Sequence, residues 1–392
     1  MKKKIAFVNK ALWYGGIETS LITLLDRMDY EKYDVTLILF RAVFDFDLKE
    51  RINKHCRLIV LDRDETATFG IGYKYSKLYH FTEPCDNPSW KHKMILWTVP
   101  GVKWLENELY IKYAKRMLKN EQFDTVVIYS DAVGEISVRA IKADKYLMFY
   151  HHGAMRHVYH EKTAYKKCEK IIAVSENLAE ALKEFHPEYK EKVTSIHNLT
   201  DVEGIRKKGM APLEETFDDA KFHIVTVGRV SHEKGMDIAV RVCAKLVEDG
   251  FENIRWWIVG EGPAMEEVRN LIAELRMQDY VFTVGRKSNP YPYIRRADLY
   301  VQPSRVEGYP MTILEALVLG CAVISTDNPG ASEIIKNDLM GILCPLDVKS
   351  LRNSIEMIIQ NPWELQKIKS SVAQLDFVKE NHKNVINLEK LL

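Results

Sequence analysis

Short apolar runs recur along the whole chain, and most are followed by a turn and a segment with helical periodicity. The first run is Ile5 to Val8, and helical spacing follows it from Ile17 to Met28. Strands that alternate with helices in this way favour a parallel sheet that is covered on both faces. The other strands predicted in the N-terminal half are 34–40, 57–61, 125–129, 146–150, 170–174 and 193–196.

The same alternation begins again after a polar stretch, residues 198–220, whose glycines and proline are typical of an interdomain connection. Because 392 residues are many for one hydrophobic core, we expect two domains, each with a Rossmann-like order of strands and helices. The fold class is therefore α/β. The second series of predicted strands is 223–227, 254–259, 281–284, 299–302, 322–325 and 341–344.

The amino-acid composition limits which binding partners and which cellular compartment are expected for this protein. The 56 Lys and Arg residues balance 55 Asp and Glu residues, which argues against a protein that binds nucleic acid by displacing counterions. The N-terminal apolar run is too short for a secretory signal, and no run reaches the roughly 18 apolar residues of a membrane span. We expect a cytoplasmic protein with free thiols, because no cysteine lies in a C-x-x-C pair. The six cysteines are Cys56, Cys85, Cys168, Cys243, Cys321 and Cys344.

The stretch from Pro303 to Leu317 carries the clearest candidate chemistry. It follows a predicted strand and places Glu307 and Glu315 eight residues apart, with a Gly-Tyr-Pro turn between them. Pro310 suits the first turn of a helix, because proline has no N–H to leave unpaired there. Glu307 is then expected in the loop and Glu315 about one turn inside the helix. The free N–H groups of that helix start would face the same cleft.

These groups suit a sugar nucleotide. Backbone amides would hold the phosphates, one carboxylate would accept hydrogen bonds from the ribose, and the other would accept them from the sugar. A pair of solvated glutamates at a helix start is the plainer interpretation, because Glu is usually exposed. The Ser-x-x-Glu-Gly-x-Pro frame and the strand before it favour the binding site.

Two other junctions between a strand and a loop carry candidate binding groups. Gly15 and Gly16 follow the first strand, where the backbone would approach a ligand closely with a helix N-terminus aimed at it. Arg229 and Lys234 lie five apart after the first strand of the second series, where they would clamp a diphosphate. Each signal alone is weak, because glycine pairs mostly make turns and loop cations are mostly solvated.

Four histidines crowd the end of the strand predicted at 146–150. His151 and His152 stand at the sheet edge where α/β proteins bind ligands, and His157 and His160 follow them. A zinc site is the weaker interpretation, because no Asp, Glu or Cys at suitable spacing completes a ligand set. No metal ligand is assigned. The Asp-x-Asp triplets at residues 45–47 and 62–64 are interpreted as chance patterns.

Together these motifs resemble family 4 of the retaining glycosyltransferases, enzymes of the GT-B fold. The spacing of Glu307 and Glu315 matches the family's Glu-x7-Glu signature, and the likeness extends over essentially the whole chain. The resemblance implies two Rossmann-like domains whose parallel sheets face each other across a cleft. Residues 1–200 would bind the acceptor and residues 201–371 the nucleotide-sugar donor. A C-terminal helix, 372–392, would cross back to the first domain.

The resemblance also implies roles for individual residues. In the family, the Gly-Arg-x4-Lys-Gly pair binds the donor phosphates and stands in for a metal ion, which gives that role to Arg229 and Lys234. A family histidine touches the sugar near its anomeric centre, and the sequence leaves His151 and His152 as alternatives for it.

The resemblance implies further donor-binding residues near the nucleotide base of the donor and around the Glu-x7-Glu signature. Arg286 and Lys287 end a strand in the region that lies near the base in the family. The family often has Gly-Gly-x-x-Glu where this chain has Pro329 and Gly330, which leaves the role of Glu333 open. The remaining candidates for donor binding are Gly15, Gly16, Glu307, Gly308, Tyr309, Pro310, Met311 and Glu315.

Residues 70–120 differ from the rest of the chain. They contain nine Lys or Arg against four Asp or Glu, and nine aromatic residues that include Trp90, Trp97 and Trp104. Such a segment can lie on an anionic membrane surface or line an acceptor groove. The alternative is a helix that packs on the sheet with its lysine stems along apolar surface. Peripheral contact with the inner face of the cell membrane is thus one expectation.

The activity implied by the resemblance is transfer of a sugar from a nucleotide-sugar, with a UDP-sugar the expected donor, to a saccharide or lipid-linked acceptor. Cell-surface polysaccharide or glycolipid assembly is the expected setting. Retention of anomeric configuration and catalysis without a metal ion or other cofactor are implied as well. The alternatives are a nonhydrolysing sugar-nucleotide epimerase or a phosphorylase of the same fold, and a nucleotide-sugar binding protein without transferase activity.

Overall fold

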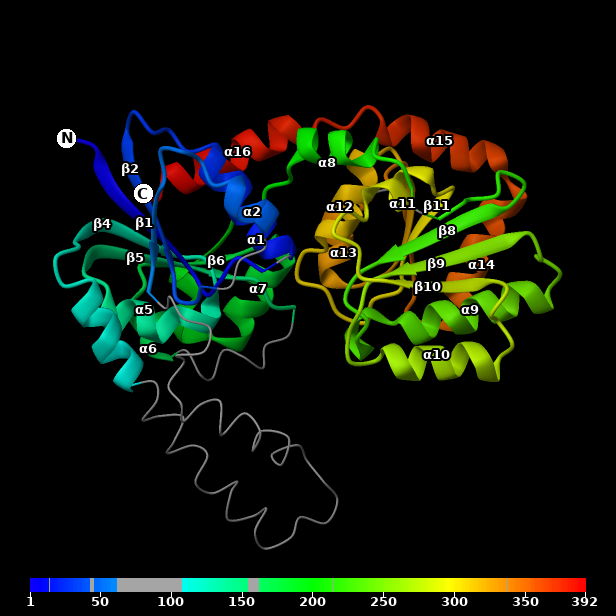
Figure 1. Ribbon diagram of the computed structural model, residues 1–392, viewed down its shortest axis with the longest axis horizontal. Helices are drawn as coiled ribbons and strands as arrows, with labels where there is room; N and C mark the ends of the chain where they lie inside the picture. The colour runs from blue at the N-terminus through cyan, green and yellow to red at the C-terminus, as the bar shows by residue number, and fades with distance from the viewer. Residues whose placement is uncertain (14, 43–45, 62–107, 154–161, 214, 337) are drawn as a thin grey trace, which may run out of the picture.

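The computed structural model describes residues 1–13, 15–42, 46–61, 108–153, 162–213, 215–336 and 338–392 (Figure 1). The described chain forms two lobes that lie side by side, each built on a parallel sheet. Every strand predicted from the apolar runs coincides with a strand of one of the two sheets. The fold is therefore α/β with two Rossmann-like units, as the alternating pattern predicts.

The N-terminal sheet has the strand order β3-β2-β1-β4-β5-β6-β7, and all of its pairs are parallel. Ile5 and Val8 of β1 are fully buried, because helices cover both faces of the sheet. The order of strands reverses between β1 and β4, and ligands of such sheets bind beyond the strand ends at that point. The strands are β1 (Lys3–Asn9), β2 (Tyr33–Leu39), β3 (Arg57–Val60), β4 (Phe123–Ile128), β5 (Ala143–Tyr150), β6 (Lys170–Ala173) and β7 (Val193–Ser195).

The C-terminal sheet has the order β10-β9-β8-β11-β12-β13, again with parallel pairs, and its order reverses between β8 and β11. The loops after β8 and β11 carry Arg229 and Glu307, so the second reversal point also coincides with the predicted site. The strands are β8 (Phe222–Val227), β9 (Ile254–Val259), β10 (Val281–Gly285), β11 (Leu299–Gln302), β12 (Ala322–Thr326) and β13 (Ile342–Cys344).

Helices cover both sheets. Those of the N-terminal lobe include α1 (Gly16–Asp26), α2 (Phe46–Glu50), α5 (Gly134–Ala140), α6 (Lys162–Lys167) and α7 (Glu176–Phe185), together with a helix over residues 108–117. Those of the C-terminal lobe are α9 (Met236–Glu248), α10 (Met265–Glu274), α11 (Tyr291–Arg296), α12 (Met311–Val318), α13 (Pro329–Ile334), α14 (Val348–Gln360) and α15 (Pro362–Val372).

The connection between the lobes is partly helical. Helix α8 (Val202–Gly209) lies inside the stretch predicted as a polar connection, and its Val202 and Ile205 are buried in the C-terminal core. Leu199, earlier in the same stretch, is buried in the N-terminal core, so the chain passes from the core of one lobe to the core of the other between Leu199 and Val202. Polar composition alone did not indicate this helix, because only its inner face is apolar.

The last helix, α16 (Phe377–Glu389), returns to the N-terminal lobe (Figure 1). Its Val385 and Leu388 belong to the same buried cluster as β1 and β4. Where the chain crosses between the lobes for the second time, the side-chain amide of Asn381 donates to the Thr200 carbonyl at 2.7 Å and accepts from the Thr200 N–H at 3.0 Å. The two crossings are thus bonded to each other.

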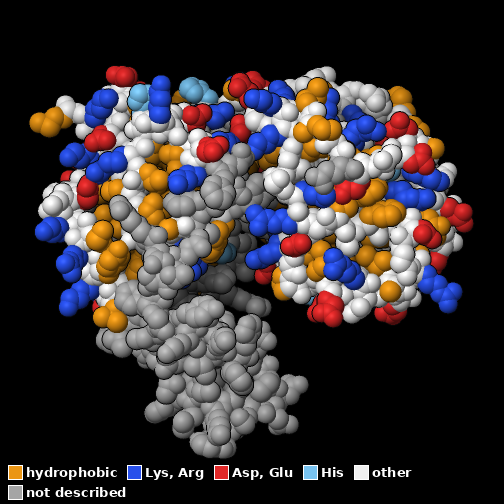
Figure 2. All heavy atoms as spheres, in the orientation of Figure 1, with side chains coloured by type: hydrophobic (Ala, Val, Ile, Leu, Met, Phe, Trp, Pro, Cys, Tyr) orange, Lys and Arg blue, Asp and Glu red, His pale blue; other side chains and the backbone are white. Residues whose placement is uncertain are grey.

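Charge on the visible surface of the C-terminal lobe is mixed, with blue and red side chains interspersed (Figure 2). This agrees with the balanced composition of the chain. Among the described residues, no helix is both long enough and apolar enough to span a bilayer.

Candidate active site

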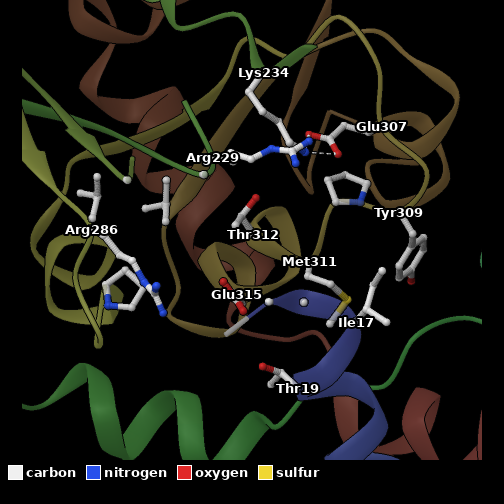
Figure 3. Close-up of a pocket in the computed structure, with 18 of the residues that line it drawn as sticks. Ile17, Thr19, Arg229, Lys234, Arg286, Glu307, Tyr309, Met311, Thr312 and Glu315 are labelled. Carbon is white, nitrogen blue, oxygen red and sulfur yellow. Dashed lines mark hydrogen bonds and ion pairs between the residues drawn. The ribbon is translucent and has the colours of Figure 1, made fainter. Parts of the chain in front are cut away.

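A cavity of about 510 Å³ lies between the two lobes, at the strand ends where both sheets reverse their order (Figure 3). Both lobes line it. The predicted residues that the structure brings together there are Gly15, Gly16, His151, Arg229, Lys234, Arg286, Lys287, Glu307, Tyr309, Pro310, Met311 and Glu315. The predicted residues His152 and Gly308 lie beside this cavity and do not line it.

Glu307 is held at the floor of the cavity by an ion pair with Lys234. The Lys234 Nζ lies 2.7 Å from each carboxylate oxygen, and the Glu307 side chain is 6% exposed. A buried charge of this kind is stable only when it is paired and hydrogen-bonded. The carboxylate is therefore held rigidly before any ligand enters.

The loop that carries Lys234 is fixed against the loop after β11. Gly235 has a φ of +66°, and a Cβ there would lie 2.0 Å from the Pro303 carbonyl oxygen, so only glycine fits. The Arg305 guanidinium bonds both carboxylate oxygens of Asp237 at 2.8 and 2.7 Å. These contacts explain why Gly follows Lys in this loop, and they hold Lys234 opposite Glu307.

Glu315 lies inside the first turns of α12, as predicted, and its side chain points into the cavity (Figure 3). Pro310 precedes the helix as its cap and Met311 is the first helical residue, one position later than expected. The Tyr291 hydroxyl donates to the Glu315 carboxylate at 3.2 Å. Burial raises the pKa of Glu315 to about 7, although the Tyr291 hydrogen bond opposes that shift.

Three of the cationic side chains that line the cavity, Arg229, Lys287 and Arg286, differ in their surroundings. The Arg229 side chain is 65% exposed, and its one ion pair within the described part of the chain is a 3.3 Å contact with Glu233 on its own loop, so its guanidinium is available to a ligand. Lys287 is ion-paired with Glu215 at 2.8 Å, and its ammonium lies over the Tyr293 ring. Arg286 extends along the opposite end of the cavity from Glu307 (Figure 3). Cationic side chains therefore lie at both ends of the cavity.

His151 and His152 have different environments. His151 lines the cavity and is 9% exposed, and neither ring nitrogen makes a hydrogen bond of normal geometry with a described residue. Burial lowers the pKa of His151 to about 4, although the charge of Asp131 opposes that shift, so its ring is neutral at pH 7. Of the two histidines, His151 is the one placed toward the cavity.

His152 points instead toward Asp131, with 3.1 Å between Nε2 and Oδ2. This hydrogen bond raises the pKa of His152. Asp131 is 5% exposed and follows β4, at the reversal point of the N-terminal sheet. Sequence reasoning missed Asp131, and the signal that could have found it is its place directly after an apolar strand.

Glu333, whose role the sequence left open, contacts the other lobe. Its carboxylate accepts from the N–H groups of Glu176 and Asn177, at 3.0 and 3.2 Å, and lies 2.9 Å from His197 Nε2. Residues that line the cavity without having been predicted include Ile17, Thr19, Asn198, Tyr291 and Thr312. Their apolar or small polar side chains carry no pattern that distinguishes them from core residues.

Several expectations lie outside the described residues. These are the Asp-x-Asp triplet at 62–64, the side chains of 45–47, His157 and His160, and residues 70–107 of the basic aromatic segment. Cys85 is in the same segment, while the five other cysteines are free and buried. Among the residues that are described, no group of three or more His, Cys, Asp or Glu side chains is arranged to hold a metal ion.

Two family models match the two halves of the chain. The one described as "Glycosyltransferase Family 4" matches residues 14–203, and the one described as "Glycosyl transferases group 1" matches residues 212–374. A Campylobacter jejuni N-acetylgalactosaminyltransferase that acts on a diphospho-undecaprenol-linked saccharide is 26% identical over 362 residues, covering 88% of this chain and 87% of its own. An uncharacterised glycosyltransferase of Methanocaldococcus jannaschii is 27% identical over 47% of this chain and 44% of its own.

Solved glycosyltransferases share the fold. Anabaena HepE, solved with UDP, has a TM-score of 0.67 and 17% identity over 99% of this chain and 100% of its own. The TarM mutant of S. aureus, also solved with UDP, has a TM-score of 0.71 and 12% identity over 98% and 99%. Both lobes, the cavity between them and both family matches lead to the same conclusion. This chain belongs to family 4 of the glycosyltransferases and has the GT-B fold.

Proposed function

We propose that this glycosyltransferase moves a sugar from a UDP-sugar to a saccharide or lipid-linked acceptor, with retention of anomeric configuration, in cell-surface polysaccharide or glycolipid assembly. The observation that carries the proposal is the convergence of two carboxylates, Glu307 and Glu315, and two cations, Arg229 and Lys234, on one cavity between two lobes. UDP is supported as the nucleotide by the structures of HepE and TarM, which were solved with it.

The donor would lie along the cavity from Arg286 to Glu307. Glu315 is on the side of Tyr291 and Arg286, where it would accept hydrogen bonds from the ribose hydroxyls. Arg229, Lys234 and the N-terminus of α1 would hold the diphosphate, because a helix start presents free N–H groups to an anion. Glu307 would then face the sugar.

In the transfer step, the bond between the anomeric carbon and the diphosphate oxygen breaks, and a bond from the acceptor hydroxyl forms on the same face. The departing diphosphate takes the proton of that hydroxyl. Arg229 and Lys234 stabilise the negative charge that develops on the diphosphate, which is the largest contribution such a site makes. His151, neutral and buried, would contact the sugar near its anomeric carbon without adding a charge there.

We further propose that the reaction requires no metal ion or cofactor. Arg229 and Lys234 supply positive charge where the diphosphate would lie, which is the task a divalent cation performs in metal-dependent transferases. The N-terminal lobe would bind the acceptor near the ion pair of Asp131 and His152.

Contact with an anionic membrane would involve the described end of the basic aromatic segment. The helix over residues 108–117 exposes Leu109, Tyr113 and Met117, which are four residues apart and therefore share one face. Lys112 and Arg116 lie next to this apolar stripe. An exposed apolar stripe with cations beside it suits the surface of an anionic bilayer, where a lipid-linked acceptor would be found.

The experiment that tests the function measures release of free nucleotide from UDP-, GDP- and ADP-sugars with and without a lipid-linked saccharide acceptor. A transferase releases nucleotide only when acceptor is present, and the product carries the sugar in the donor's anomeric configuration by NMR. An epimerase would change the donor without an acceptor, and a binding protein would release nothing. Either of these results would refute the proposed transfer.

A further inference from the structure

Gln302 is a polar side chain at the end of the buried strand β11, and it is 1% exposed. Its Oε1 accepts from the Tyr300 hydroxyl at 2.5 Å and the Thr312 hydroxyl at 3.2 Å. Its Nε2 donates to Ser304 Oγ at 2.7 Å and to Glu307 Oε1 at 2.9 Å. The Glu307 carboxylate can only accept, so the amide nitrogen must face it. A buried amide with all these partners has one orientation.

The two carboxylate oxygens of Glu307 consequently differ. Oε1 receives hydrogen bonds from Gln302 Nε2, from Ser304 Oγ at 2.7 Å and from Lys234 Nζ at 2.7 Å. From the residues that the structure describes, Oε2 receives one, from the same ammonium at 2.7 Å. Because a carboxylate oxygen has about two lone-pair sites, Oε1 is fully occupied while Oε2 keeps one for a ligand.

We propose that Gln302 is a positioning residue that locks the Glu307 carboxylate so that Oε2 is the atom presented to the sugar of the donor. This inference rests on the proposed function, in which Glu307 faces the sugar. The terminal torsion of a glutamate is broad, so the carboxylate turns easily unless its oxygens are fixed from outside the ligand site. Gln302 and Ser304 supply that restraint from the buried side, opposite Lys234.

The first test compares wild-type protein with Gln302→Met, which is similar in length and donates no hydrogen bond. The probe is whichever of UDP-glucose, UDP-galactose and UDP-N-acetylglucosamine the wild-type enzyme transfers. We expect kcat to fall about 10- to 100-fold, the cost of misplacing a group that contacts the reacting sugar. Affinity for UDP alone should stay at the wild-type value, since UDP lacks the sugar. A wild-type kcat, or an equal loss of UDP affinity, overturns the proposal.

A second variant, Gln302→Glu, adds a pH readout that a purely structural role would not give. When protonated, this side chain keeps an O–H for Glu307 and a carbonyl for Tyr300, whereas its ionised form repels Glu307. The charged or titratable groups around it are Lys234, Glu307, Glu315 and Tyr300. The ratio of the kcat of Gln302→Glu to the kcat of Gln302→Met should rise as pH falls. A ratio that is the same at every pH contradicts the assigned role.

A third measurement needs no donor and so separates this inference from the proposed function. The melting temperature of Gln302→Glu relative to wild type should rise as pH falls, because the buried acid takes up a proton on folding. In the double variant Gln302→Glu/Glu307→Gln, the increase in melting temperature should begin at a lower pH, since one neighbouring negative charge is gone. If the melting temperature increases over the same pH range in the single and double variants, the proposed contact between residues 302 and 307 is wrong. A wild-type protein that transfers no sugar would defeat the proposed function and leave this result standing.

Discussion

The Glu333 carboxylate of the C-terminal lobe lies 2.9 Å from the imidazole Nε2 of His197, in the last segment of the N-terminal lobe. The same carboxylate accepts from the first N–H groups of α7, which the Ser175 cap leaves unpaired. Tyr309, which lines the cavity, stacks on the His197 ring with 4.9 Å between ring centres. One buried carboxylate therefore joins the two lobes at a point adjoining the donor site.

Replacing Glu333 by Gln should destabilise this junction. Burial alone would raise the pKa of Glu333, but the hydrogen bonds from His197, Glu176 and Asn177 outweigh it and lower the pKa from 4.5 to about 2. A lowered carboxyl pKa gives stability that is complete above pH 4.5 and is lost as pH falls toward 2. At neutral pH we expect the free energy of unfolding of Glu333→Gln to be about 1–3 kcal/mol lower than that of wild type, because buried partners of the carboxylate lose their hydrogen bonds.

The measurement is the melting temperature of both proteins as a function of pH. The difference between wild type and Glu333→Gln should be constant above pH 4.5 and shrink below it. Glu184→Gln, an exposed change on α7, the helix that Glu333 contacts, is the control and should follow wild type throughout. A difference that is the same at every pH would mean that the Glu333 charge does not stabilise the junction.

Gly308 and Gly153 allow the two lobes to touch beneath the cavity. A Cβ at Gly308 would lie 2.5 Å from the His151 carbonyl oxygen, and a Cβ at Gly153 would lie 2.7 Å from the Glu307 carbonyl carbon. We expect Gly308→Ala to hold the lobes apart and to reduce kcat at least about tenfold, because small misplacements of catalytic groups are costly. Gly250→Asn should keep wild-type turnover, because no atom lies within 4 Å of the added Cβ and the strain of its φ of +92° is local to a turn. Normal turnover in Gly308→Ala would show that this close contact is dispensable.

Much of the fold was predictable from sequence because it depends on local patterns. Each buried strand is an apolar run, and the loops that end β8 and β11 contain the glycines and charges that the site needs. The convergence of Glu307 with Lys234 follows from two loops at the same sheet edge, and the motif spacing indicated it. The resemblance to a known family brought these separate segments into one predicted site.

Other features of the site depend on contacts between segments distant in sequence. Asp131 and His152 meet because β4 and β5 are neighbours, and neither residue has the spacing of a recognisable motif. Gln302 resembles any residue at a strand end until its four hydrogen bonds are seen. The role of Glu333 depends on its contact with His197 of the other lobe. Sequence periodicity reports burial, and it carries no information about which buried polar groups are paired.

Arg229 and Lys234 are expected to supply the charge that a metal ion would otherwise provide. Arg229→Ala and Lys234→Ala should each cost about 2–4 kcal/mol of transition-state stabilisation, as loss of a donor to a developing charge does. The measurement is kcat/KM for each variant, with Arg296→Ala, an exposed residue paired to Asp219, as the control. Wild-type activity should survive EDTA. Loss of activity in EDTA that Mn²⁺ restores would contradict catalysis without a metal.

The helix over residues 108–117 is expected to bring the protein to anionic bilayers. Lys112→Glu and Arg116→Glu should each weaken binding to phosphatidylserine vesicles, since a basic residue near such a surface contributes about 1 kcal/mol. Cosedimentation with vesicles measures this, and binding should fall as salt is added. Phosphatidylcholine vesicles are the control, and equal binding to both lipids would argue against an electrostatic contact.

Glu315 should make donor binding depend on pH near neutrality. Burial raises its pKa from 4.5 to about 7, so the folded protein holds a proton that the unfolded chain releases. A raised carboxyl pKa stabilises the fold fully below pH 4.5, and that contribution is lost as pH rises through 7. The melting temperature of Glu315→Gln should therefore lack the decline that wild type shows between these two pH values.

If the ionised carboxylate accepts the ribose hydroxyls, UDP binding will release a proton near pH 7, which calorimetry in two buffers of different ionisation enthalpy detects. Tyr291→Phe removes the hydroxyl that stabilises the carboxylate and should raise its pKa further, moving the proton release to higher pH. Proton release that is identical in wild type and Glu315→Gln would exclude Glu315 as its source.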